Sequence, residues 1–155
     1  MSTDPRPLPV TYAAIVFKGE HLDPDLVSAI MEREPTLSYR RGETYSVKGQ
    51  AQERRFGLWV YSTRNLVASG SLKKHLEALE IAILGLRSAW SEKRWLKMKA
   101  LVEAQGVELR IDVFWYGPAG TEFPHISLSF QHLIDEAGGT IQTDFHRDED
   151  ETQVA

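Results

Sequence analysis

The sequence has no cysteine among its 155 residues. This absence excludes a disulfide framework, a thiolate metal site and a cysteine nucleophile together, and it fits a reducing compartment. Long apolar runs are also missing: none approaches the roughly 18 residues that a membrane-spanning helix needs, and residues 1–9 lack the apolar segment of a secretory signal. We therefore expect a cytoplasmic protein with no membrane partner.

A strong net charge is missing as well. The formal net charge is −4, and residues 147–151, with one basic and four acidic side chains, supply −3 of it. The rest of the chain is close to neutral, so it lacks the broad positive surface that dominates affinity for nucleic acid, and we expect no nucleic-acid partner. The length fits one domain. We predict a disordered leader at 1–10, a single α+β domain at 11–146 and an acidic disordered tail at 147–155.

Recognisable catalytic motifs are absent too. The sequence has no nucleophile elbow, phosphate-binding loop, dinucleotide fingerprint or HExxH motif. His21, Asp23 and Asp25 alternate as metal ligands can, but Asp23 is better placed to cap a helix, and a metal site needs three or four converging groups. We therefore assign no catalytic residue, no metal site and no cofactor.

Apolar spacing predicts the strands and the first helix. Residues 11–18 are mostly apolar on both faces of a strand, which indicates a central position in a sheet. Asp23-Pro24 is a helix start, because the carboxylate accepts free N–H groups and proline needs no donor there. Pro35 ends this helix by Glu34, since the residue before proline avoids helical geometry. The other predicted strands are 36–40, 58–62, 107–116 and 140–145.

Three further helices follow from caps and apolar stripes. Ser71 is placed to cap a helix whose apolar residues recur every three or four positions up to Trp90. A second helix capped at Ser91 ends at Gly106, and the two could form one bent element. Ser127 or Ser129 caps the last helix, which Gly138 and Gly139 close.

The same order of elements occurs twice. Segments 12–40 and 110–144 both run strand, helix, strand, and Leu26 aligns with Phe130 when the helices are placed side by side without gaps. The only insertion is the loop after Gly117. The whole order is β-α-β-β-α-α-β-α-β. We predict an α+β fold in which a ferredoxin-like β-α-β-β-α-β unit is extended by a further α-β, with pseudo-symmetric halves. The sheet is expected to be mainly antiparallel, with the helices packed on one face.

Several short motifs occur in a fixed order along the chain. They are Leu22-Asp23-Pro24, Glu34-Pro35-Thr36, Arg41-Gly42, Trp59, the long helix from Leu72, and Ile126-Ser127-Leu128-Ser129 before the last helix. In these motifs and their spacing the sequence resembles the family called domain of unknown function 4279, from residue 11 to residue 145. The resemblance implies a small bacterial α+β domain with no established activity. It implies a fold and assigns no site residue.

Residues 40–55 form the first candidate surface. Five basic residues against two acidic ones give this segment a net charge of +3. Such a segment, with aromatic residues that include Trp59 nearby, is suited to grip a phosphate, a carboxylate or an acidic protein surface. The alternative is a solvated hairpin connection whose arginines pair with neighbouring acids. The candidate residues are Arg40, Arg41, Arg54, Arg55 and Trp59.

The insertion at 118–124 is the second candidate. It lies between the end of a strand and a helix N-terminus, where anions bind readily and where function is often added to a scaffold. It would form a lip over a pocket lined by Asp112, Tyr116 and His125. The alternative is an ordinary glycine-proline turn that connects two elements.

Three functions remain open. The favoured one is a non-enzymatic protein-interaction or regulatory module of an immunity-like kind, which binds an unknown protein through the basic segment, the mixed face of the sheet or an edge strand. The second is a small anionic-ligand binder or modest enzyme with a pocket at the 117–125 loop, which requires Asp112, His125 and an arginine to converge. The third is a homodimer formed by edge strands or by the tryptophan-bearing helix.

Overall fold

The structure, a computed structural model, describes residues 10–85 and 92–148. The predicted leader and acidic tail, and the helix cap predicted at Ser91, fall almost entirely outside these ranges. Two residues assigned to the tails, Val10 and Arg147, belong to strands. Apart from these two residues, the domain boundaries remain predictions from the sequence.

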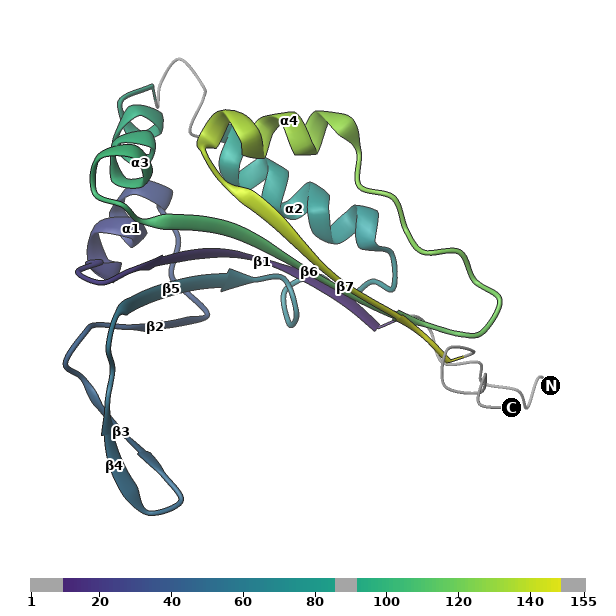
Figure 1. The fold of residues 1–155 in the computed structure, drawn as a ribbon. Coiled ribbons are helices and arrows are strands. Elements are labelled where there is room, and N and C mark those ends of the chain that lie inside the picture. Colours follow the sequence, from purple (N-terminus) through teal and green to yellow (C-terminus); the bar gives the residue numbers. More distant parts are fainter. Residues whose placement is uncertain (1–9, 86–91, 149–155) are drawn as a thin grey trace.

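Five strands form one sheet in the order β2-β5-β1-β6-β7 (Figure 1). Neighbouring strands are antiparallel except β6 and β7, which are parallel. β1 lies at the centre, as its two apolar faces predicted. The fold is therefore α+β with a mostly antiparallel sheet. The strands are β1 (Val10–Gly19), β2 (Leu37–Tyr39), β5 (Gly57–Ser62), β6 (Glu108–Gly117) and β7 (Thr140–Arg147).

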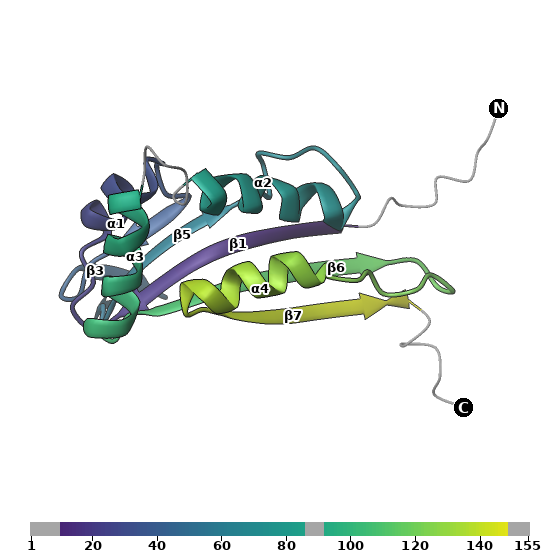
Figure 2. The ribbon, with the colours of Figure 1, turned by 90° about the horizontal axis from the view of Figure 1, so that it is seen from above.

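The helices of the described residues all lie on one face of this sheet (Figure 1). α2 packs over β1 and α4 lies along β7, while α1 and α3 contact each other at one end (Figure 2). Two of the predicted caps are confirmed: Asp23 accepts the N–H of Asp25, and Ser127 accepts the N–H of Phe130. Ser71 stands at the N-cap of α2, but its side chain makes no capping hydrogen bond. The helices are α1 (Pro24–Met31), α2 (Leu72–Leu84), α3 (Glu92–Ala104) and α4 (Leu128–Ala137).

The core lies between the helices and the sheet. Alternate residues of a strand point to opposite faces, and the residues of β1 that face the helices, Ala13, Ile15 and Phe17, are at most 1% exposed. Trp59 of β5 is 0% exposed. Its ring meets that of Phe17 edge-on at 5.8 Å, and its Nε1–H donates to Ser28 Oγ at 3.0 Å. Trp59 therefore joins the central strands to α1.

A buried polar cluster ties α2 to β1. His75 of α2 is 1% exposed, and its Nε2 lies 2.7 Å from the carbonyl oxygen of Ser69, which can only accept. Its Nδ1 lies 2.6 Å from Thr63 Oγ1, and that oxygen also accepts the N–H of Ala13 at 3.0 Å. Each buried polar group thus has a partner. The imidazole of His75 therefore has a structural role, because it links α2 to β1 through Thr63.

An arm projects from the sheet on the side away from the helices (Figure 1). It is a hairpin of β3 (Thr44–Val47) and β4 (Gln50–Glu53) joined by Lys48-Gly49. Both turn residues have positive φ, 51° and 79°, as a two-residue type I′ turn requires. At the base, Arg54 N–H donates to the carbonyl oxygen of Glu43 at 2.8 Å. The hairpin that was one of two interpretations of residues 40–55 is thus present, as an ordered pair of strands.

The two repeated halves differ in packing. β1 and β2 are separated by β5, whereas β6 and β7 are direct neighbours. In α1, Val27 is 1% exposed and Leu26 is 40% exposed, although its counterpart Phe130 in α4 is 1% exposed. The repetition therefore lies in the order of elements, and the buried face of α1 is rotated from the one that the alignment implied.

Candidate binding surface on the open face of the sheet

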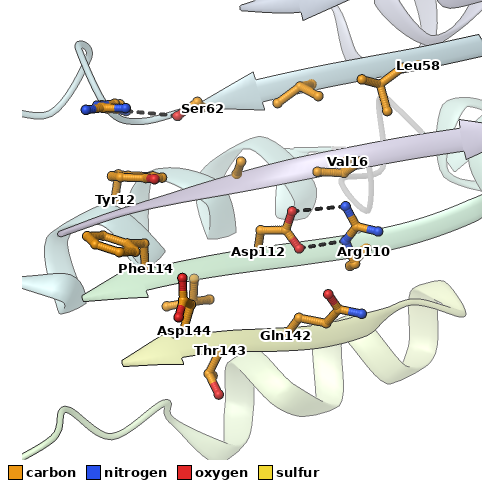
Figure 3. A pocket seen from close by; sticks show the side chains of 14 residues that line it. Tyr12, Val16, Leu58, Ser62, Arg110, Asp112, Phe114, Gln142, Thr143 and Asp144 are labelled. Carbon is orange, nitrogen blue, oxygen red and sulfur yellow. Dashed lines mark hydrogen bonds and ion pairs between the residues drawn. The ribbon is translucent and has the colours of Figure 1, made fainter. Parts of the chain in front are cut away.

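The face of the sheet opposite the helices carries a groove of about 530 Å³ (Figure 3). Its lining follows from the alternation of strand residues: those of β1 and β6 that do not face the helices point into it. We call this surface the open face. Its lining includes Tyr12, Ala14, Val16, Leu58, Val60, Ser62, Arg64, Arg110, Asp112, Phe114, Gln142 and Asp144.

The floor of the groove is apolar. Val16 and Ala14 of β1 are 3% and 7% exposed, although none of the described helices covers this face. They are flanked by Val60, which lies opposite Val16 in the neighbouring strand. The apolar floor continues to the edge of the sheet, because Leu37 of β2 lies opposite Val60 and is 51% exposed. This aliphatic strip is therefore buried at the centre of the sheet and open to water at its edge, at Leu37.

One end of the floor is bounded by a row of rings. Tyr12 and Phe114 are opposite each other in the register of β1 and β6, and their rings stack with centroids 5.0 Å apart. Arg64 Cζ lies 5.1 Å from the Tyr12 ring, and the His146 ring lies 6.2 Å from Phe114. We call these four residues the first row. The row crosses the sheet from the end of β5 to β7.

The other end is bounded by a second row that leads into the arm. Lys18 Nζ lies 4.2 Å from the Phe56 ring centroid, and Phe56 and Tyr39 have centroids 6.0 Å apart. Arg54 Cζ then lies 3.9 Å from the Tyr39 ring and 3.7 Å from the Tyr45 ring. Such cation–π contacts contribute about 0.5–1 kcal/mol each at exposed sites. This second row therefore holds the arm in a defined orientation against the sheet.

The charge in the middle of the groove is neutralised. Arg110 Nε donates to Asp112 Oδ1 at 2.6 Å and Nη2 donates to Oδ2 at 3.1 Å, a bidentate pair that Figure 3 shows. These hydrogen bonds raise the pKa of the Arg110 guanidinium above its ordinary value. By contrast, Lys18, Arg54 and Arg64 of the two rows have no carboxylate within ion-pair distance in the part of the chain that the structure describes. The unbalanced positive charge thus lies on the rim.

A sequence model of the family described as Domain of unknown function (DUF4279) matches residues 9–147, which hold the whole sheet and all the described helices. The chain belongs to the DUF4279 family. No curated protein and no solved structure matches it. Because the family description names no activity, the function of this DUF4279 domain has to be argued from its surface.

Two predicted site residues lie on or beside the open face, and a third does not. Asp112 faces the groove through its pair with Arg110. Tyr116 lies near the end of β6, where its hydroxyl donates to Asp148 Oδ1. Trp59 was predicted to contact a ligand or partner, but it is fully buried under the helices and has no exposed surface to offer. It belongs to the core of the DUF4279 domain.

The arginines at the start of the basic segment are paired with acids near α1. Arg40 Nη1 lies 2.7 Å from Asp23 Oδ1, and Arg40 also pairs with Asp25. The hydrogen bond with Asp23 is the main reason why the pKa of Arg40 lies above its ordinary value. Arg41 Nη1 lies 2.8 Å from Glu20 Oε1. These two cations therefore serve mainly to attach the segment before the arm to the start of α1.

His125 lies elsewhere. It is exposed in a separate groove of about 450 Å³ between α2 and α4, on the helix side of the sheet. The loop before it is fixed by Phe123, whose ring packs against Trp115 at 5.7 Å. Asp112 and His125 thus lie on opposite faces, and Arg41 lines a third hollow beside the arm. The geometry does not bring the predicted acid, imidazole and arginine into one pocket.

The described residues of the DUF4279 domain show no group of three histidine, aspartate or glutamate side chains arranged to hold a metal ion. Among the same residues, no helix is long and apolar enough to cross a membrane. The sequence indicated the mixed face of the sheet as a possible binding surface, but not the apolar groove on it. The alternation of residues along β1 and β6 identifies which residues of each strand share a face. The pairing register of the two strands is needed to show that Tyr12 lies opposite Phe114.

Proposed function

We propose that this DUF4279 domain is a non-enzymatic protein-interaction module that binds its partner on the open face, beside the β3–β4 arm. The observation that carries the proposal is the groove with its apolar floor, which lies between two rows of rings and cations on the face that the described helices leave open. Arginine and aromatic residues are the side chains most enriched where protein interfaces have their binding energy. The open face supplies both kinds at the edges of an aliphatic strip.

The size of the surface favours a protein over a small molecule. The first row contains Tyr12 and the second contains Lys18, six residues further along β1. At about 3.3 Å per residue the two rows are roughly 20 Å apart. Full burial of an exposed aliphatic side chain contributes about 1.5–3 kcal/mol, and Leu37 has 51% of its surface left to bury. A partner that spans both rows would cover the floor as the helices cover the other face.

The proposal includes several finer expectations. An immunity-like or regulatory role and a cytoplasmic location remain our expectations for such a module. We also infer that the elements from β1 to β6, without the β3–β4 arm, form a ferredoxin-like unit. The strands of this unit stand in the order β2-β5-β1-β6, and neighbouring strands are antiparallel. α4 and β7 would then be an addition at its edge. A solved structure with another strand order would contradict this inference.

A homodimer is the second candidate. β7 is an eight-residue strand at the edge of the described sheet, and such an edge can pair with a second copy. Light scattering separates this alternative from the first: a mass near the 17.6 kDa of one chain would contradict the dimer. An interaction module that binds on the open face does not require self-association.

Replacing Leu37 with aspartate tests the proposed function. We expect the tagged wild-type chain to retain a partner from an extract of its native host, and Leu37→Asp to lose that partner. The charge would have to be buried in the centre of an apolar contact, and an unpaired buried charge is strongly unfavourable. Leu37 is already 51% exposed, so its replacement should leave the fold intact. The measurement is the amount of captured partner, quantified by mass spectrometry.

The matched control is Ile81→Asp on the helix layer. Ile81 is 67% exposed on α2, so this variant adds the same charge at an exposed aliphatic position on the opposite side of the protein. It should retain the partner. Equal capture by wild type and Leu37→Asp, or loss with Ile81→Asp alone, would show that the open face is not the binding surface.

A further inference from the structure

Arg54 is held in an unusual way at the base of the arm. Its Cζ lies 3.9 Å from the Tyr39 ring centroid and 3.7 Å from that of Tyr45. Two rings cannot occupy the same face of one guanidinium at these distances, so the group lies between them. Its backbone is fixed as well, because it donates to Glu43 and accepts from Gly42 at 2.9 Å. Both the position and the plane of this guanidinium are thus set before any ligand arrives.

A guanidinium covered on both faces can form hydrogen bonds only in its own plane. Arg40, Arg41 and Arg110 each use such bonds on a carboxylate of this chain. Within the described residues Arg54 has no carboxylate at ion-pair distance, and its guanidinium contacts the two rings. The in-plane donors of arginine match the two oxygens of a carboxylate or phosphate, and a pre-organised fork loses little entropy on binding.

The surroundings favour a singly charged ligand. Arg54 lines a hollow of about 520 Å³ with Arg41, Gln52, Glu53 and Arg55. Three arginines and one glutamate give this lining a net charge of +2, but Arg41 is already paired with Glu20. The rest of the charged lining, Arg54, Arg55 and Glu53, has a net charge of +1, which one carboxylate neutralises and a dianionic phosphate would exceed.

We propose that Arg54, clamped between Tyr39 and Tyr45, is a carboxylate-binding site. The ligand group is the side chain of an aspartate or glutamate, or the C-terminus, of a partner protein, taken in the plane of the guanidinium. The identity of the partner as a protein rests on the proposed function, whereas the carboxylate site itself does not. The site makes the proposed function more specific: the surface would recognise a partner protein that carries an acidic group next to an apolar segment.

Titration with acetate, followed by the Arg54 Nε–Hε resonance in ¹⁵N-correlation NMR spectra, tests the site without the partner. At constant ionic strength we expect a saturable shift of this resonance. In Arg54→Lys, which keeps the charge and loses the planar fork, the backbone amides of residues 52–55 should report binding about tenfold weaker, a change in Kd that corresponds to about 1.4 kcal/mol. Tyr45→Leu, which removes one side of the clamp, should weaken acetate binding in the same direction.

Arg55→Lys is the matched control, since Arg55 lines the same hollow and is exposed, and within the described residues no ring stacks on it. It should leave acetate binding unchanged. A parallel titration with inorganic phosphate distinguishes the two oxyanions, and tighter binding of phosphate than of acetate would overturn the carboxylate assignment. A non-saturating shift, or equal weakening in Arg54→Lys and Arg55→Lys, would overturn the site. Acetate binding is measured on the protein alone, so its result is independent of whether Leu37→Asp loses the partner.

Discussion

Replacing Trp59 with alanine is expected to lower the free energy of unfolding by about 3–5 kcal/mol, the usual cost of removing a buried aromatic side chain. Trp59 is 0% exposed and is the largest of the fully buried side chains in the described core. Its ring contacts Phe17 and stacks with Tyr61 at 6.3 Å. Its removal opens a cavity where β5, β1 and α1 meet, and no small movement of these elements would refill it.

Urea unfolding followed by circular dichroism measures this effect without reliance on tryptophan fluorescence. Trp59→Phe is the control: it keeps an aromatic ring and loses the hydrogen bond to Ser28, so its loss should be clearly smaller than that of alanine. A loss below about 1 kcal/mol for Trp59→Ala is the size typical of an average substitution and would mean that Trp59 is not at the centre of the core.

Gly57→Ala is expected to destabilise the protein by about 3 kcal/mol, the upper part of the range for overpacked sites. Gly57 lies opposite Gly19, where the chain between β1 and α1 crosses the end of β5. A Cβ at Gly57 would lie 2.4 Å from the carbonyl oxygen of Leu22 and 2.9 Å from its Cβ. The obstructing atoms include the backbone, so the connection to α1 would have to move.

Gly85→Ala is the matched control for this clash. Gly85 follows α2 with φ −55° and ψ −28°, and a Cβ there meets nothing within 4 Å. Alanine fits this helical geometry and reduces the freedom of the unfolded chain, so stability should rise by about 0.4–1 kcal/mol. The same urea measurement applies to both variants. Equal effects of the two substitutions would contradict the close contact at Gly57.

Local chemistry made much of the fold predictable. Asp23-Pro24 and Ser127 start helices in the structure as their capping chemistry predicts, and Gly138 ends α4 with a φ of 83°. The two apolar faces of β1 correctly placed it at the centre. These features depend on neighbours within a few residues, which the sequence displays directly.

The arm was harder to predict because its strands lack an apolar face. β4 is Gln50–Glu53, with all four residues exposed, so no alternation between buried and exposed positions marks it as a strand. The Lys48-Gly49 turn is its clearest sequence signal. The side chains of Tyr39, Tyr45 and Arg54 are brought together by strand pairing and by the backbone bonds at the arm's base.

The open face could be predicted only in part. The mixed face of β6 was evident from Arg110, Asp112 and Phe114, which alternate with apolar residues. The described helices leave this face open because each segment that connects two strands through a helix places that helix on the other face of the sheet. That arrangement depends on the whole chain and not on local sequence. The prediction for Trp59 was wrong in the opposite sense. Its charged neighbours in the sequence indicated an exposed position, but Trp59 lies on the buried face of β5.

The most direct test of the open face as a binding surface is hydroxyl-radical footprinting of the chain with and without its captured partner. The method measures the rate at which exposed side chains are oxidised. We expect the rates at Leu37, Tyr39 and Phe114 to fall several-fold in the complex. Two exposed residues of the helix layer, Ile81 and Leu128, which are 67% and 71% exposed, should keep their rates. Protection of Ile81 and Leu128 with unchanged oxidation of Leu37 and Phe114 would contradict the proposal.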